Sequence, residues 1–61
     1  MKRGTLIVRE YRASYRDAIC HHARVTLGAR LIAEATSDLR DVAVNAAIDE
    51  AAEQKVEVSH D

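Results

Sequence analysis

The fold of this chain is decided by residues 11–35, which read YRASYRDAICHHARVTLGARLIAEA. Apolar and small side chains recur here at alternating steps of four and three residues, the heptad spacing of helices that pack side by side. The residues of this seam are Tyr11, Tyr15, Ala18, His22, Val25, Ala29 and Ile32. The spacing predicts a long helix over residues 11–35. Gly28 within it would either end the helix or allow a second helix to approach closely.

A second helix is expected after the polar segment Ala35-Thr36-Ser37-Asp38, because serine, threonine and aspartate side chains accept hydrogen bonds from the free N–H groups of a helix start. The residues that follow are rich in alanine and end near Lys55. The sequence therefore predicts an all-α helical hairpin, with helices at about 11–35 and 38–55. Because the chain contains no proline, a single uninterrupted helix over residues 11–55 is the alternative.

Both ends of the chain are expected to lie outside this hairpin. Residues 1–10 include the β-favouring run Thr5-Leu6-Ile7-Val8 and are predicted to form a short extended arm. Residues 56–61 are predicted to be a flexible polar tail. Residues 1–61 would thus make a single small helical domain.

The small core predicts self-association. The chain has 61 residues, no Phe or Trp, and a single cysteine that excludes an internal disulfide. Cys20, Leu27 and Leu31 would form a second stripe opposite the seam, and this stripe needs a second partner helix. We expect a dimer that forms a helical bundle, or a tetramer. The residues predicted to mediate self-association are Tyr15, His22, Val25, Ile32 and Leu39.

Charge is distributed unevenly along the chain. Residues 1–30 hold seven lysines and arginines against two acidic residues, whereas residues 31–61 hold two against eight. The two halves either neutralise each other by packing together, or form a basic face for nucleic acid and an acidic tail. Tyr11 and Tyr15 among arginines would suit nucleic acid, although protein contacts are favoured. The residues predicted to bind an external partner are Arg12, Arg16 and Arg24.

No catalytic residue, metal site or cofactor is expected. Cys20, His21 and His22 would point about 100° apart on a helix and could not converge on one ion. No base or oxyanion hole is evident for Cys20 as a nucleophile. The longest apolar run near the start, Leu6 to Val8, is too short for a signal peptide or a membrane span. With a single cysteine, these features predict a cytoplasmic protein that is not an enzyme and does not bind membranes.

The favoured function is a small regulatory interaction protein that acts as a homo-oligomer through protein contacts. An assembly adaptor that forms higher oligomers is a further possibility. The alternative is a DNA-binding transcriptional regulator, because a β-favouring segment followed by two predicted helices over residues 5–55 resembles the ribbon-helix-helix repressors. That resemblance implies groove reading by Thr5, Ile7 and Arg9.

Over its whole length the chain also resembles the small helical early-region accessory proteins of lambda-like temperate phages. The resemblance lies in its size, in the basic start Met1-Lys2-Arg3-Gly4 and in the acidic, alanine-rich segment NAAIDEAAE of residues 45–53. It implies a protein of the host cytoplasm that tunes lysogeny or host takeover through protein contacts. It assigns no functional residue, because no motif aligns.

Overall fold

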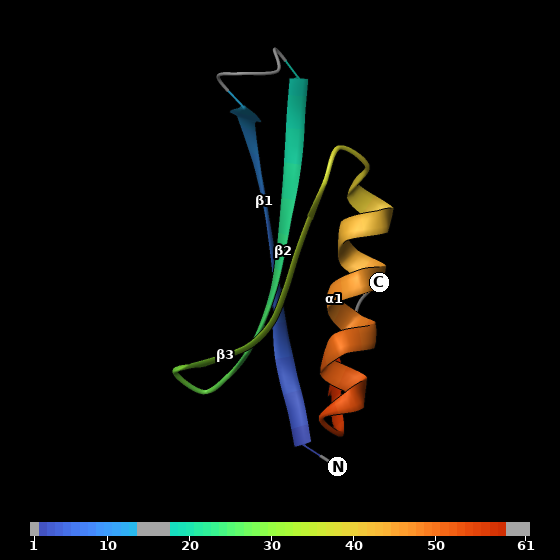
Figure 1. Cartoon of the computed structure of the whole chain (residues 1–61). Helices are drawn as coiled ribbons and strands as arrows, with labels where there is room; N and C mark the ends of the chain where they lie inside the picture. Colours follow the sequence, from blue (N-terminus) through green and yellow to red (C-terminus); the bar gives the residue numbers. More distant parts are fainter. Residues whose placement is uncertain (1, 14–17, 59–61) are drawn as a thin grey trace.

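The computed structural model describes residues 2–13 and 18–58, which form four strands and one helix. Strands β1 (Lys2–Ala13), β2 (Ala18–Leu27) and β3 (Arg30–Ser37) come first. They are followed by helix α1 (Arg40–Glu53) and the short strand β4 (Val56–Val58). Figure 1 shows the long β1–β2 hairpin with the single helix lying along one side of the sheet.

The predicted all-α hairpin is wrong, and so is the alternative of one continuous helix, because residues 18–37 form two strands. A helix is present within the second predicted interval, but it is the only helix among the described residues. Along β2 the side chains alternate, with Ala23 and Val25 in the core and His22 and Arg24 on the other face. Alternation with period two is typical of a strand covered on one face. The heptad positions fitted a helix because alanine and histidine are compatible with either structure.

Gly28 lies in the turn between β2 and β3 and has neither of its predicted helical roles. Leu27 and Arg30 are cross-strand partners, so Gly28 and Ala29 form a two-residue loop. Gly28 has a φ of 64°, whereas Ala29 is not among the residues with positive φ. Glycine with positive φ at the first central position is typical of a type II′ turn, which matches the twist of a hairpin.

The sheet has the strand order β3-β2-β1-β4. β2 is antiparallel to both of its neighbours, and β4 runs parallel to the start of β1, where Lys2, Arg3 and Gly4 pair with residues 56–58. Val56 is buried. The prediction of a flexible tail is therefore wrong for residues 56–58, while residues 59–61 lie outside the described residues. The predicted N-terminal arm is the first part of β1.

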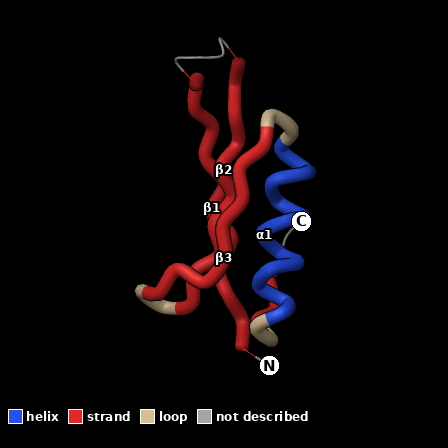
Figure 2. Tube along the Cα trace, viewed as in Figure 1, coloured by secondary structure: helices blue, strands red, loops and turns tan. Residues whose placement is uncertain are grey.

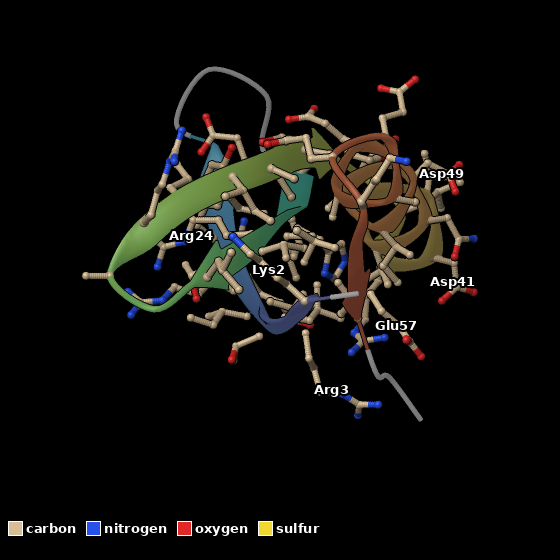
Figure 3. All side chains as sticks on the ribbon, turned by 90° about the horizontal axis from the view of Figure 1, so that it is seen from below. Lys2, Arg3, Arg24, Asp41, Asp49 and Glu57 are labelled. Atoms are coloured by element: carbon tan, nitrogen blue, oxygen red, sulfur yellow. The ribbon has the colours of Figure 1, made fainter. Side chains whose placement is uncertain are left out.

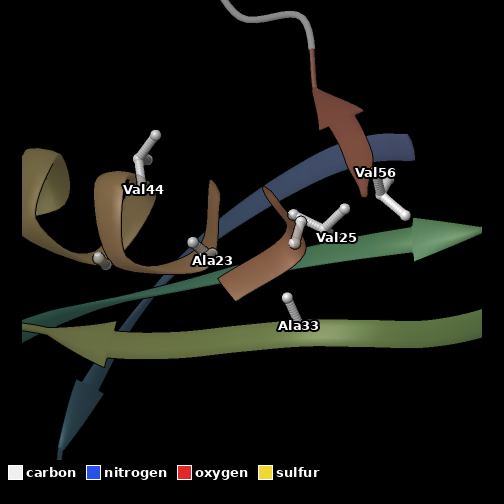
Figure 4. Packing of buried hydrophobic residues seen from close by; sticks show 8 residues of the cluster. Ala23, Val25, Ala33, Val44 and Val56 are labelled. Atoms are coloured by element: carbon white, nitrogen blue, oxygen red, sulfur yellow. The ribbon is translucent and has the colours of Figure 1, made fainter. Parts of the chain in front are cut away.

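Helix α1 covers one face of the sheet, over β2 and β3, and also contacts β4 (Figure 2). The core is made almost entirely of alanine and valine, and Val25 is its largest fully buried side chain (Figure 4). The buried residues of the cluster are Ala23, Val25, Ala33, Ala43, Val44, Ala47, Ala51 and Val56. Small side chains on both surfaces let the helix backbone approach the sheet closely.

Gly4 is buried where β1, β2 and β4 meet. A Cβ atom at this position would lie 2.8 Å from Val25 Cγ1, 2.9 Å from Val56 Cγ1 and 3.1 Å from the Thr26 carbonyl oxygen. The two distances to the valine methyl groups are shorter than real Cβ contacts, so a side chain at position 4 would displace Val25 or Val56. Glycine at this position therefore allows β1, β2 and β4 to pack closely.

We expect Gly4→Ala to lower the free energy of unfolding by about 1–3 kcal/mol, because overpacking displaces Val25 or Val56. Urea denaturation measures this change. Thr5→Ala, at the next and exposed position, is the control and should cost less than about 1 kcal/mol. Equal stability of the Gly4→Ala variant and the parent protein would contradict the close packing.

The turn between α1 and β4 places a lysine in a conformation that favours glycine. Lys55 has a φ of 61°, and its N–H donates to the Ala52 carbonyl oxygen at 2.9 Å. The N–H of Gln54 donates to the Ala51 carbonyl oxygen at 3.0 Å, which completes the end of the helix.

Lys55→Gly should raise the free energy of unfolding by about 0.5–1 kcal/mol, because it relieves the left-handed backbone strain by more than the entropy gained by the unfolded chain. Lys55→Ala removes the same side chain but keeps the Cβ atom, and we expect no gain from it. Thermal and urea denaturation of both variants test this. An equal gain in both variants would show that backbone strain is not the cause.

Candidate functional site

The face of the sheet that points away from α1 is not covered by any other described element. We call it the open face, and its members follow from strand alternation and from the registers of all four strands. They are Arg3, Thr5, Ile7, Arg9 and Tyr11 of β1, His22, Arg24 and Thr26 of β2, Leu31, Glu34 and Thr36 of β3, and Glu57 of β4; Cys20 of β2 also points to this side but is buried. Cations, hydroxyl groups, an imidazole and an aromatic ring thus share one surface.

Charge separates between the two layers of the molecule. Among the described residues, the segment 2–37 carries six lysines and arginines against two acidic residues. Residues 38–58, which contain the helix and β4, carry two against six. Figure 3 shows Arg24 on the sheet and Asp41 and Asp49 on the helix, at opposite sides of the molecule. The fold thus places most of the cations on β1, β2 and β3 and most of the carboxylates on α1, although Glu57 lies on β4 within the sheet and Lys2, Glu10 and Arg12 point to the helix side of it.

Arg24 lies near the centre of the open face, between an apolar and an acidic residue of the neighbouring strands. It is the cross-strand partner of Ile7 on one side and of Glu34 on the other. Its Nε atom is buried without a hydrogen-bond partner. Glu34 Oε2 lies 3.4 Å from His22 Nε2. The open face has two carboxylates among the described residues, Glu34 and Glu57, and Glu57 Oε1 lies 3.9 Å from an Arg3 guanidinium nitrogen. Glu34 is the one beside Arg24, so it is the residue that opposes an anionic ligand there.

Beyond the end of β3, the β1–β2 hairpin continues as a two-stranded arm. The pairing of β2 with β3 ends at His21 and Ser37, whereas β1 and β2 remain paired up to Ala13 and Ala18. Figure 2 shows this arm extending past the N-terminal end of the helix. It has a shallow hollow lined by Glu10, Tyr11, Arg12 and Ile19. Tyr11 and Ile19 are about half exposed, at 47% and 51%.

The predicted partner-binding residues are only partly described. Arg24 belongs to the open face, and Arg12 lies on the arm opposite Ile19. By strand alternation, Arg12 and Arg24 point to different faces of the hairpin. Arg16 lies outside the described residues. The structure therefore does not bring Arg12 and Arg24 onto one surface, and Arg9 is the nearer companion of Arg24.

The helical seam that motivated the predicted self-association residues is absent. Val25 is fully buried in this chain's own core, and Ile32 is partly buried against that core. His22 belongs to the open face, while Leu39 precedes the helix and is 61% exposed. Tyr15 lies outside the described residues. The four described residues thus lie in three separate environments.

The structure also changes the geometry of Cys20, His21 and His22. On a strand, Cys20 and His22 share the open face, and His21 points to the helix side. His21 Nδ1 is buried and lies 3.7 Å from Glu10 Oε1. Within residues 2–13 and 18–58, no group of three histidine, cysteine or acidic side chains is placed to hold a metal ion. The helix in this part of the chain is also too short to span a bilayer.

Sequence reasoning missed Thr26 and Thr36 as possible contact residues. The signal that could have revealed them is the alternation of residues 22–26, in which His22, Arg24 and Thr26 are polar while Ala23 and Val25 are apolar. Alternation of this kind predicts a strand in a sheet with one solvent-exposed face and one buried face.

A comparison with protein-family models, curated proteins and solved structures finds no match to this chain. The resemblance to phage early-region proteins therefore stays a prediction. The ribbon-helix-helix organisation is wrong, because that organisation needs two helices and the described residues contain one. The arrangement of side chains on the open face and on the arm is therefore the basis for assigning a function to this chain.

Proposed function

We propose that this chain is a small non-enzymatic protein that binds nucleic acid through the open face of its sheet and through the β1–β2 arm. The observation that carries the proposal is the uncovered face of the sheet, on which Arg3, Arg9 and Arg24 lie, backed by a helix rich in carboxylates. The sequence alone favoured protein contacts, because the net charge is close to zero. Because the cations and most of the carboxylates lie on different sides of the molecule, a net charge close to zero does not argue against binding of a polyanion to the sheet side.

A polyanion would be oriented by this charge distribution. Nucleic acid would be attracted to the sheet side and repelled from the helix side, where Asp41, Asp49 and Glu53 are exposed. Binding of this kind depends on cations that replace condensed counterions, so it weakens steeply as salt rises.

The open face also offers the groups that contact nucleic acid. Arg9 and Arg24 are diagonal neighbours across β1 and β2, because Arg9 pairs with His22 and Ile7 pairs with Arg24. Two guanidinium groups on adjacent strands can contact neighbouring phosphates. The hydroxyl groups of Thr5 and Thr26, which are direct cross-strand partners, can donate to phosphate oxygens beside them.

The shape of the arm supports the same proposal. The major groove of B-form DNA admits a two-stranded β-ribbon, and the arm is such a ribbon. Tyr11, exposed on the arm, can stack on an unpaired base or lie against a sugar. The arm would enter the groove while Arg9 and Arg24 contact the backbone.

A second candidate is the regulatory interaction protein expected from the sequence, which would act on a protein partner. Leu39 and Val42 favour it, because they are 61% and 51% exposed at the start of the helix. They lie one turn apart, on the layer opposite the open face. An apolar pair of this kind can serve as a contact for another protein.

For nucleic acid binding, we expect Arg9→Gln and Arg24→Gln each to weaken affinity for long duplex DNA and to reduce the salt slope by about one. Glu34→Gln should strengthen binding, because it removes the carboxylate that lies beside Arg24 on the open face. Arg40→Gln, at an exposed position on the helix, is the matched control and should change the DNA affinity little.

Fluorescence anisotropy at several salt concentrations measures these effects, and circular dichroism checks the fold of each variant. Failure of the parent protein to bind duplex or single-stranded DNA at low salt would overturn the proposal.

A further inference from the structure

His22 lies on the open face between two groups of opposite charge. It is the direct cross-strand partner of Arg9 on β1, and its Nε2 atom lies 3.4 Å from Glu34 Oε2 on β3. Its side chain is 30% exposed, so a ligand on the open face can reach the ring. Histidine is the side chain whose charge ordinarily changes between about pH 5 and pH 8. The charge at this point of the open face therefore depends on pH.

The open face carries little net charge while His22 is neutral. Its charged side chains among the described residues are three arginines and two glutamates, namely Arg3, Arg9, Arg24, Glu34 and Glu57. Three cations against two carboxylates leave one positive charge, and a protonated His22 raises it to two. A single proton thus doubles the net charge that a polyanion meets on this face.

The neighbours of His22 act on its charge in opposite directions. Glu34 stabilises the protonated ring, whereas Arg9, directly across the strand pair, and Arg24, two residues along β2, oppose it. Phosphates bound by Arg9 and Arg24 would neutralise the two groups that oppose the proton. Binding of nucleic acid and protonation of His22 would then favour each other, because such a coupling is reciprocal.

The other titratable side chains beside His22 do not compete for the same proton. They are Tyr11, diagonally across β1 and β2, and Cys20, two residues earlier on β2. Tyrosine and cysteine ordinarily lose their protons only above about pH 8. The carboxylates of α1 do not face the ring, because the helix covers the other side of the sheet.

The two nitrogen atoms of the imidazole ring give protonation a geometric consequence. A neutral ring has one N–H group, whereas a protonated ring donates from both nitrogens. With Glu34 beside Nε2, the protonated ring can keep this contact and still donate from Nδ1 to a phosphate oxygen. His22 thereby changes from a neutral neighbour of the two arginines into a third cationic contact.

His21 is the natural comparison, because it also lies beside a glutamate. Its Nδ1 atom lies 3.7 Å from Glu10 Oε1, and its side chain is 15% exposed. It points to the helix side of the sheet, so it does not share a face with Arg9 and Arg24. A proton on His21 would add charge away from the open face.

We propose that protonation of His22 regulates nucleic acid binding at the open face, so that the chain takes up a proton on binding and binds more tightly below neutral pH. This regulation rests on the proposed function, because it acts on the same surface. It concerns one residue of that surface, and it can fail while the binding itself is real.

The first test is fluorescence anisotropy with a labelled duplex DNA at about 0.1 M salt, from about pH 8 to about pH 5.5. The parent protein should bind about fivefold to tenfold more tightly at the lower pH, with a salt slope steeper by about one, because one more cation contacts the phosphates. His22→Gln should lose most of this gain. His21→Gln is the matched control and should keep it, and circular dichroism at both pH values checks the fold.

The outcomes separate the regulation from the binding. Binding by the parent protein that does not change with pH would overturn the role of His22 and leave the proposed function standing. A gain that persists in His22→Gln and disappears in His21→Gln would also overturn that role. Absence of binding at every pH and at low salt would overturn the proposed function and the regulation together.

The second test needs no substitution, so it decides even if His22→Gln does not fold. The histidine ring signals of the parent protein are followed by NMR at about pH 7 while a short duplex is added. The ring signals of His22 should move toward those of the protonated form, and those of His21 should stay in place. Movement of the His21 signals alone, or of neither ring at a saturating duplex concentration, would contradict proton uptake by His22.

Discussion

The contact between the alanines of α1 and the small side chains of β2 and β3 is the constraint on which the rest of this structure depends. Ala43, Ala47 and Ala51 lie one turn apart and are fully buried against the sheet. They bring the helix close, but they bury little apolar surface, so the stabilisation from this core is small for a chain of this length. The larger apolar side chains lie at its margins or outside it.

That contact also fixes which surfaces stay free. A single helix of 14 residues over β2 and β3 leaves one whole face of the sheet, the flank of β1 and the end of the hairpin uncovered. The carboxylates of α1 and the arginines Arg9 and Arg24 lie on opposite sides of that contact, and the buried layer between them has no polar side chain among the described residues. The alanine contact therefore separates these two groups of charges.

Binding of a polyanion to the open face depends on long-range charge, which salt screens and which tolerates many geometries. It is set by the side chains of the strands, and the strand registers determine which of these side chains share the open face.

The sequence by itself determined the small number of large apolar residues and the charge asymmetry between its halves, because both follow from composition. It also determined a helix after Ser37, because a polar break followed by an alanine-rich segment acts locally. It also indicated the β preference of Thr5 to Val8. Only the tertiary structure decided that residues 18–37 form strands. Ala23, Val25 and Ala33 fit a helical or an extended pattern equally well, and the choice depends on the cross-strand pairing of β2 with β1 and β3, which local periodicity does not show. The open face could not be foreseen for the same reason, since strand registers bring Arg9, Arg24 and Glu34 together and local periodicity contains no information about register.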